Sequence, residues 1–256
     1  MKITFLGTGT SQGVPVIGCS CEVCTSLDFR DKRLRSSVQI QIAQKSFVID
    51  TGPDFRQQML RERVKRIDAI LFTHAHRDHT AGLDDVRAYN FMQRMDMPVY
   101  GRQEVLDQLK IEYAYAFSKE NYPGIPRLLL NLIDGQTFSI DGIKITPLEV
   151  LHLKMPVLGF RFGNFSYITD ANFIPDETLK KLDGTEVLVL NALQRTPHIS
   201  HFNLDEALAM VEKIRPTQTY FTHISHNLGL HADVSKELPD NVMLSYDGLQ
   251  LDVGDL

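Results

Sequence analysis

The sequence predicts an α/β protein in which short strands alternate with helices and carry polar side chains at the points where the strands end. Residues 69–72, Ala-Ile-Leu-Phe, form a short and continuously apolar run of the kind expected of a strand buried on both faces. A loop rich in histidine follows this run directly. Further strand-like runs occur in both halves of the chain, between segments with helical spacing.

Length and composition fit one folded unit. The chain has 256 residues, of which 43% are hydrophobic and 23% charged, so we expect a sizeable core and a single domain over residues 1–256. The formal charge of -5 provides no strong field for a long polyanion, and we expect no long nucleic acid as a partner. A small anionic substrate is compatible with this charge, because bound dications would reverse the local sign.

The beginning of the chain indicates a cytoplasmic protein. Residues 16–19 resemble a lipoprotein cleavage box, but the glycine-rich residues 7–13 interrupt any apolar run of the length a signal peptide needs. No run approaches a membrane span, so we expect no membrane partner, and a homodimer is left open. The 3 cysteines all fall within residues 19–24, which favours reduced thiols and a metal over a disulfide framework.

The first strand is expected at residues 2–6 and leads into the loop at residues 7–13. This loop has no lysine and precedes no clear helix, so it is not a Walker loop. Its glycines either let the backbone pass close to the site or offer N–H groups to a phosphate, and the sequence leaves both readings open.

An antiparallel hairpin and a helix follow. Residues 37–43 alternate in period two, and residues 46–50 form a second strand after a turn at Gln44 and Lys45. A helix is then expected to run to about Arg63, with Asp54 as its N-cap. Residues 84–94 and 103–109 also have helical spacing, whereas residues 113–126 are aromatic and then rich in Pro and Gly, and could form a lid or an interface. The aromatic side chains of this stretch are expected to pack, with stacking on a substrate as the alternative.

In the second half, each candidate site residue follows a strand-like run. Residues 143–150 lead to His152, residues 159–162 and 165–169 lead to Asp170, and residues 217–221 lead to His223. Another buried strand is expected at residues 187–190 and a helix at residues 204–214.

The sequence Thr-His-Ala-His-Arg-Asp-His at residues 73–79 predicts a metal site. It supplies His74, His76, Asp78 and His79 directly after a strand. Neutral imidazole and carboxylate suit Zn, Mn or Fe. The alternative is a solvated loop that is rich in histidine by chance.

The His-x-His-x-Asp-His motif of residues 74–79, followed in order by a later His, Asp and His, resembles the metallo-β-lactamase superfamily over nearly the whole chain. The resemblance implies an αββα sandwich of two mixed β-sheets flanked by helices. It also implies two divalent ions, Mn or Zn, with a hydroxide between them as nucleophile. The implied ligands are His74, His76 and His152 for one ion, Asp78, His79 and His223 for the other, and Asp170 as the bridge. An aspartate at the bridge is usual for phosphodiesterase members.

The cysteine cluster narrows the resemblance to particular branches of the superfamily. Cys19, Cys21 and Cys24 lack one ligand of a tetrahedral zinc, and His226 would complete a structural Cys3His knuckle at about residues 19–24. This set, with the Gly-Thr-Gly at residues 7–9, resembles PhnP-type cyclic phosphodiesterases. A similar knuckle occurs in the branch that resembles the pyrroloquinoline quinone biosynthesis B protein. Buried thiols without a metal are the alternative.

The resemblance also places a non-ligand histidine, His201, between the bridging Asp and the last His. It would be the general acid that protonates the leaving alkoxide, since a histidine ordinarily titrates near neutrality. We group Asp78 with it as a catalytic residue. His198 is a rival for the same role, and for His198 and His231 a surface position is expected.

The implied function is a metal-dependent phosphodiesterase that hydrolyses a small anionic phosphodiester, a cyclic ribose or nucleotide phosphate. A tRNA 3′-processing nuclease is the alternative enzyme, which the absence of a long arm and a basic stripe disfavours. A quinone-cofactor biosynthesis protein of the same superfamily is the alternative outside hydrolysis, and the complete ligand set disfavours it.

Overall fold

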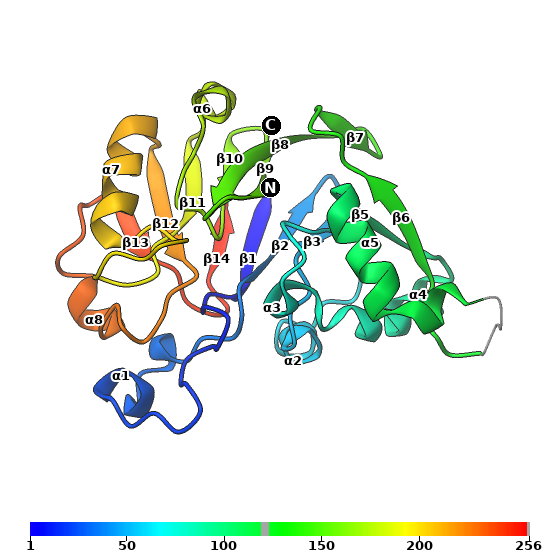
Figure 1. Ribbon diagram of the computed structural model, residues 1–256, viewed down its shortest axis with the longest axis horizontal. Coiled ribbons are helices and arrows are strands. Elements are labelled where there is room, and N and C mark those ends of the chain that lie inside the picture. Colours follow the sequence, from blue (N-terminus) through cyan, green and yellow to red (C-terminus); the bar gives the residue numbers. More distant parts are fainter. Residues whose placement is uncertain (119–122, 255–256) are drawn as a thin grey trace.

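The computed structural model describes residues 1–118 and 123–254, and these ranges contain two seven-stranded β-sheets. The strand order is β14-β1-β2-β3-β4-β5-β6 in the first sheet and β13-β12-β11-β10-β9-β8-β7 in the second. The sheets lie at the centre and the helices lie on the two outer sides (Figure 1). Both sheets mix parallel and antiparallel neighbours, so the predicted αββα sandwich is confirmed.

The bounds of the elements are as follows. The first sheet contains β1 (Lys2–Gly7), β2 (Ser37–Ile42), β3 (Lys45–Ile49), β4 (Ala69–Leu71), β5 (Met97–Gly101), β6 (Leu128–Leu132) and β14 (Gln250–Asp252). The second contains β7 (Phe138–Ile140), β8 (Ile143–His152), β9 (Met155–Phe162), β10 (Phe165–Tyr167), β11 (Val187–Asn191), β12 (Gln218–Thr222) and β13 (Val242–Leu244). The α-helices are α1 (Glu22–Thr25), α2 (Phe55–Arg61), α3 (Arg77–Thr80), α4 (Arg87–Gln93), α5 (Gln103–Glu112), α6 (Asp176–Leu182), α7 (Leu204–Ile214) and α8 (His231–Val234). Short 3-10 helices lie at Phe29–Asp31, Leu83–Val86 and Ala114–Phe117.

Buried apolar side chains hold the four layers together. The central cluster joins the inner faces of the two sheets, where the rings of Phe47 and Phe162 lie 5.9 Å apart. A second cluster joins the first sheet to α2, α4 and α5, and a third joins the second sheet to α6, α7 and α8. Full burial of one such side chain stabilises the fold by roughly 1.5–3 kcal/mol. Both faces of each sheet are therefore used for packing, and the strand ends remain available for polar groups.

Most predicted elements are present. β2 and β3 form the expected antiparallel hairpin, with Val38 opposite Ile49. α7 has the predicted bounds because Asn203 and Glu206 form a capping box at its start. The hairpin turn lies one residue earlier than predicted, at Ala43 and Gln44, which both have positive φ. β5, β6, β7 and α6 were not predicted, because such short runs carry little periodicity.

The N-cap prediction for Asp54 was wrong in its mechanism. Asp54 precedes α2, but its side chain makes no capping hydrogen bond. Its carboxylate instead accepts hydrogen bonds from Arg35, from the backbone N at 2.9 Å and from Nη1 at 3.1 Å. A charged guanidinium donor competes well with a neutral backbone N–H, so the ion pair holds the carboxylate away from the helix.

The surface position expected for His231 was also wrong. His231 is only 5% exposed, and its Nδ1 lies 3.1 Å from Nη2 of Arg33, which is buried as well. Burial, and then the charge of Arg33, lower the pKa of His231 to about 4. The neutral imidazole can therefore accept a hydrogen bond from the buried guanidinium, which needs such a partner. His198, by contrast, is exposed as predicted.

The aromatic stretch at residues 113–126 is described in part, because residues 119–122 lie outside the described ranges. Tyr113 packs as predicted, since it is buried and its hydroxyl donates to the carbonyl of Thr80 at 2.8 Å. Tyr115 and Phe117 are exposed. Among the helices of residues 1–118 and 123–254, none combines the length and the apolar character that a membrane crossing requires.

Candidate metal centres

The residues predicted to bind the two catalytic ions lie at the ends of strands from both sheets. His74 and His76 follow β4, and the next two candidates lie in the first turn of α3. The second sheet contributes one residue at the end of β8, one after β10 and one after β12. In chain order they are His74, His76, Asp78, His79, His152, Asp170 and His223.

The fold brings these side chains into overlapping groups whose ligand atoms lie within 4.8 Å of one another. One group consists of His74, His76 and His152. Another consists of Asp78, Asp170 and His223, and Asp170 also joins His74 and His79 in a third. The first group is the predicted first set, the other two share Asp170, and the structure groups His79 with His74 and not with Asp78 and His223.

The carboxylate of Asp170 faces both sets at once. Its Oδ2 lies 3.8 Å from Nε2 of His74, whereas its Oδ1 lies 3.5 Å from Nε2 of His79. Oδ1 also lies 3.1 Å from Nδ1 of His223. One oxygen toward each set is the geometry that a shared, bridging ligand requires.

Two histidines of the centre have a ring nitrogen that, in the described part of the chain, makes no hydrogen bond and faces only carboxylate oxygens, at 3.2 Å from Asp78 for His79 and at 3.8 Å from Asp170 for His74. Nε2 of His74 and Nε2 of His79 are buried, and neither makes a hydrogen bond within the described residues. Their Nδ1 atoms are held, that of His74 at 2.9 Å from Oγ1 of Thr73 and that of His79 at 2.7 Å from Oδ2 of Asp50. A histidine held at one nitrogen and open at the other is typical of a metal ligand. The donor set therefore fits divalent ions.

Electrostatics favours the ligand-competent forms of Asp170, His74 and His223. Burial would raise the pKa of Asp170, but the neighbouring His223 and His79 hold it well below its usual value. Burial, and then the neighbouring His79, lower the pKa of His74 far below the ordinary value, and burial lowers that of His223 to about 4. These shifts favour a carboxylate at Asp170 and neutral rings at His74 and His223. At His79, by contrast, burial would lower the pKa, but the carboxylates of Asp170, Asp50 and Asp78 raise it well above its ordinary value.

The backbone is strained at the centre. Asp50, Asp170 and His223 have φ values of 63°, 58° and 55°, in the left-handed region that residues other than glycine seldom adopt. Such conformations cost free energy and cluster at functional sites, where the surrounding fold imposes them. Here each of these residues lies just after a strand, so the bend turns its side chain into the site.

Asp50 is a site residue that the sequence analysis missed. It is fully buried after β3, and besides His79 it accepts hydrogen bonds from the backbone N of Thr73 at 2.9 Å and from Oγ1 of Thr73 at 2.8 Å. It therefore fixes the loop that begins the histidine motif. A carboxylate that ends an apolar strand could have indicated this role, but it was read only as the end of the strand.

We expect Asp50→Asn to weaken the metal site that contains His79. The amide keeps the size of the carboxylate but removes the charge that orients the imidazole, so affinity for Mn²⁺ or Zn²⁺ should fall roughly 10–100-fold at one of the two ions. Calorimetric titration of the metal-free protein measures this. Asp54→Asn is the control, because that carboxylate binds Arg35 and no histidine. Unchanged affinity in Asp50→Asn would refute the orienting role.

The glycine-rich loop at residues 7–13 is buried at its two ends, 7–9 and 13, whereas Ser11 and Gln12 at its tip are exposed. A Cβ added to Gly7 would lie 1.9 Å from the carbonyl oxygen of Arg35, so glycine is required for close approach. The backbone N of Gly9 donates to Leu34 at 2.7 Å, and that of Thr10 donates to Ile224 at 3.2 Å. Since these N–H groups already have partners, the structure favours the packing reading of this loop over phosphate binding.

His201 borders the first set of ligands. It lies in the loop after β11, and its Nε2 is 3.2 Å from Oδ2 of Asp170. Its ring stacks on that of His223 with centroids 5.0 Å apart, and the ring of His152 lies 4.6 Å away. Its Nδ1 contacts Oγ of Ser200 at 3.1 Å and Nδ1 of His198 at 3.2 Å. The structure thus brings His201 to the centre itself, with the exposed His198 beside it.

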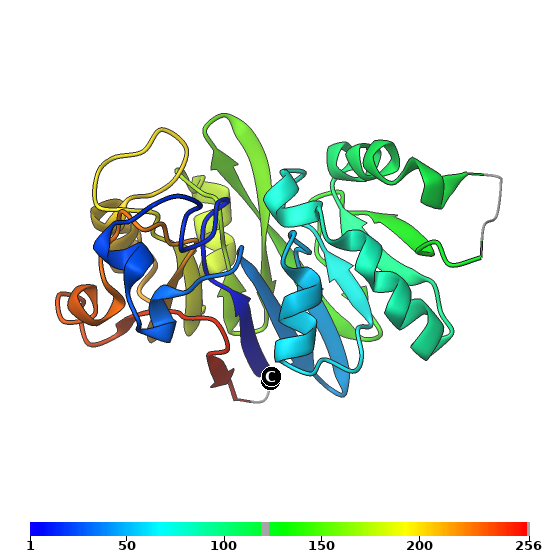
Figure 2. The ribbon, with the colours of Figure 1, turned by 90° about the horizontal axis from the view of Figure 1, so that it is seen from below.

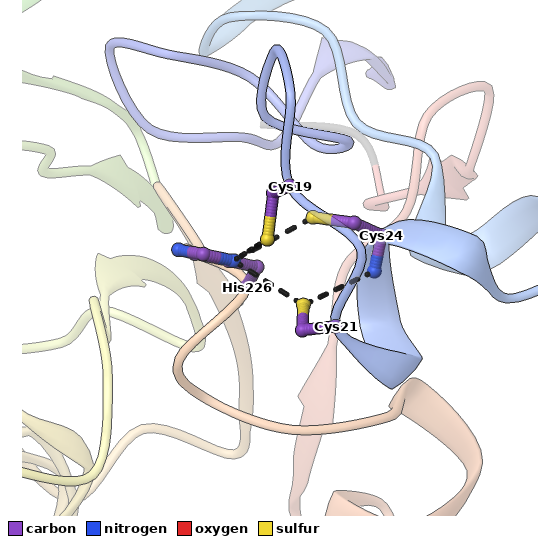
Figure 3. Close-up of side chains that lie close together, drawn as sticks. All are labelled: Cys19, Cys21, Cys24 and His226. Atoms are coloured by element: carbon purple, nitrogen blue, oxygen red, sulfur yellow. Dashed lines mark hydrogen bonds between the residues drawn. The ribbon is translucent and has the colours of Figure 1, made fainter.

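The predicted knuckle residues also converge (Figure 3). The Sγ atoms of Cys19 and Cys21 lie 3.4 Å from Nδ1 of His226, and that of Cys24 lies 3.5 Å from it. A hydrogen bond from the backbone of Cys24, and then one with His226, lower the pKa of Cys21 to about 6, whereas burial raises that of Cys24 to about 11. Three sulfurs and one imidazole around a common point fit a closed structural zinc site.

We expect Cys21→Ser to lower stability more than it lowers activity. A structural zinc contributes folding free energy, so loss of one thiolate should lower the Tm and the zinc content. The rate per folded molecule should change little, because the catalytic groups lie on other loops. Thermal unfolding with and without chelator provides the measurement, and Ser20→Ala is the neighbouring control. A Cys21→Ser protein that is inactive but as stable as the wild type would contradict a structural role.

Comparison with known proteins agrees with this architecture. A model of the beta-lactamase superfamily domain matches residues 45–224. The crystal structure of a diphosphatase from the PhnP family is similar, with a TM-score of 0.92 and 41% identity over 98% of this chain and 96% of that one. The Zn²⁺-bound PqqB from Methylobacterium extorquens has a TM-score of 0.77 at 18% identity over 99% of this chain and 100% of that one, which shows a shared fold alone.

Among curated proteins, an octanoyltransferase of Porphyromonas gingivalis is 37% identical over 253 residues. The match covers 98% of this chain but only 51% of that protein. The chain spans about half the length, or less, of the curated relatives it matches. Together, the matched superfamily domain, the two sheets and the histidine motif show that the chain belongs to the metallo-β-lactamase superfamily, within which it resembles the PhnP family.

Proposed function

We propose that the protein is a dinuclear metal hydrolase that cleaves a small phosphodiester or diphosphate. The observation that carries this proposal is the position of Asp170, which has one oxygen toward each of two ligand sets. In the proposal, one Mn or Zn ion is held by His74, His76 and His152 and the other by Asp78, His79 and His223, with Asp170 shared. A structural zinc is held by the knuckle residues Cys19, Cys21, Cys24 and His226.

When bound, two such ions would lower the pKa of a shared water and neutralise the charge that develops on the phosphorus oxygens. The protein supplies the remaining steps. His201 donates a proton to the leaving oxygen, and its contacts with Ser200 and His198 hold the ring in place. Asp50 holds His79, and the backbone carbonyl of Ser200 lies 2.8 Å from Nδ1 of His152, which fixes that ring also.

Two linkages are compatible with this site. The resemblance to PhnP-type cyclic phosphodiesterases implies a cyclic ribose or nucleotide phosphodiester. The similarity to a diphosphatase at 41% identity supports a diphosphate as the second candidate. In a cyclic phosphodiester and in a disubstituted diphosphate, the attacked phosphorus carries two bridging oxygens, and one of them is the leaving group. The same metal ligands and the same general acid could therefore catalyse either hydrolysis.

Other functions have less support. The formal charge of -5 disfavours a nuclease that clamps a folded tRNA. The complete ligand set disfavours a quinone-cofactor protein without hydrolysis, and the likeness to PqqB concerns the fold alone. Octanoyl transfer has less support, because the octanoyltransferase that this chain resembles is about twice as long as the matched region. A single domain, a cytoplasmic location and a homodimer stay predictions.

A substrate panel tests the proposal. The purified protein, loaded with Mn²⁺ or Zn²⁺, is assayed on adenosine 2′,3′-cyclic phosphate, ribose 1,2-cyclic phosphate, diadenosine diphosphate, p-nitrophenyl phosphate and an octanoyl thioester. We expect turnover of a diester or the diphosphate well above that of the monoester. Metal analysis should give about three ions per chain, with two removable separately from the thiolate-bound one. Turnover of the thioester alone would overturn the proposal.

A further inference from the structure

Three exposed apolar side chains lie beside the catalytic centre. Leu153, Phe173 and Ile199 are 50%, 53% and 74% exposed. Leu153 directly follows His152, and the other two are close in the chain to Asp170 and His201. We term these three residues the apolar rim.

The side-chain amide of Asn172 links the two segments that contain Leu153 and Ile199. The side chain of Asn172 accepts a hydrogen bond from the backbone N of Leu153 at 2.7 Å and donates one to the carbonyl of Ile199 at 3.3 Å. The backbone N of Leu151 donates to the carbonyl of Phe173 at 2.9 Å. The turn between β8 and β9 and the yellow loop after β11 lie along the same side of the molecule (Figure 2). The segments that carry the three rim residues are therefore hydrogen-bonded to one another.

The apolar rim contributes little to the core of the protein. Leu153 has a φ of 58°, a conformation in which a tight turn normally places glycine or asparagine. A leucine at this position is both strained and half exposed, and none of the rim residues belongs to the large core clusters. Positive φ also occurs in the hairpin turn at Ala43 and Gln44, so it is the position of an exposed leucine directly after His152 that points to contact with a ligand.

We propose that the apolar rim binds a nucleobase of the substrate, on the side where the leaving group departs. This inference rests on the proposed function, since it refines the substrate class of the same site. The ring of His201, the proposed acid, lies 4.6 Å from that of His152, and Ile199 precedes His201, so the rim borders the acid. Phe173 offers a ring face for stacking, and the aliphatic side chains can cover the rest of a base.

The size and charge of the apolar rim support a nucleotide over a protein partner. A stable protein interface buries about 800 Å² on each side, far more than three side chains provide. The exposed Lys154 adjoins Leu153 and supplies a positive charge for a phosphate of the same ligand. A nucleotide has a flat base for the apolar side chains and a phosphate for the charge of Lys154, so it matches both features of this surface.

Binding of a matched pair of ligands tests the inference. Adenosine 5′-monophosphate and ribose 5-phosphate differ only in the base, and calorimetry measures their affinity for the metal-loaded protein. The wild type should bind adenosine 5′-monophosphate roughly 10-fold more tightly than ribose 5-phosphate, because stacking of one base contributes about that much affinity. The variant Phe173→Ser/Ile199→Ser should lose this difference and keep its affinity for ribose 5-phosphate. Leu60→Ser is the control, because Leu60 is 61% exposed on α2.

Several outcomes would overturn the inference. Equal binding of the two ligands by the wild type excludes a base site, and loss of ribose 5-phosphate binding in the rim variant, with metal content unchanged, makes the rim a structural feature. A rim variant that changes its mass in gel filtration but keeps the nucleotide preference makes the rim an interface between copies. A wild type that prefers the nucleotide but hydrolyses neither a diester nor a diphosphate refutes the proposed function and leaves the base site standing.

Discussion

Asp170→Asn should abolish nearly all hydrolysis while the protein stays folded. The amide keeps the size of the side chain but has one poor ligand atom in place of a second charged oxygen, so it cannot serve two ions at once. Loss of several kcal/mol of charge stabilisation in the transition state corresponds to a fall in kcat/KM of about 10³-fold. The assay is run at saturating Mn²⁺ or Zn²⁺ on the best substrate of the panel.

The bridging role also predicts the metal content of this variant. Asp170→Asn should hold fewer catalytic ions and keep the knuckle zinc, whose ligands come from other loops. Circular dichroism checks that the fold is retained. Asp176→Asn is the control, because its side chain is 89% exposed on α6. An Asp170→Asn protein with full activity and both ions in place would show that Asp170 is not the bridge.

His201→Ala should have an effect that depends on the leaving group. A general acid matters most when the departing oxygen is strongly basic, so cleavage of a ribose ester should slow by roughly 10²–10⁴-fold. With bis(p-nitrophenyl) phosphate, a diester whose leaving group is p-nitrophenolate, the proton is scarcely needed, and the loss should be much smaller. Comparison of kcat for the two substrates measures the ratio.

Two controls separate acid catalysis from other roles of His201. Metal content must be measured, because Nε2 of His201 lies 3.2 Å from Asp170 and the side chain belongs to a group with His152 that could itself hold an ion. His198→Ala tests the neighbouring ring, which is exposed and contacts His201. Equal losses for both substrates with metals retained would make His201 a positioning residue and His198 the next candidate for the acid.

The sequence predicted the ligand types and their order because the chemistry requires unusual residues in a compact motif. His74, His76 and Asp78 fall within five positions, a density that polar loops rarely reach by chance. The strands that place the later residues were found because short apolar runs end just before them. The fold was predicted from the resemblance that the histidine motif carries. The individual helices and strands contributed less, because several of them have too little periodicity to be recognised.

What the sequence could not supply was the partner of each buried polar group. Asp50 and Asp54 are both aspartates near a strand end, yet one orients His79 and the other binds Arg35. His231 looks like any surface histidine until the buried Arg33 is known to lie against it. These assignments depend on contacts between segments far apart in the chain, which local pattern does not encode.

The knuckle has a consequence for the order of events in folding. Its imidazole and its thiolates are separated by more than 200 residues, since His226 is 207 positions from Cys19 and 202 from Cys24. Loop-closure entropy must be overcome before such distant groups meet, so the complete zinc site can form only late. If the proposed knuckle holds zinc, the three neighbouring thiolates would let the unfolded chain bind it already, and that early binding would reduce the stabilisation that the finished site provides. Excess zinc during refolding should therefore load the cysteines first, and His226 should join them when the two ends of the chain are in place.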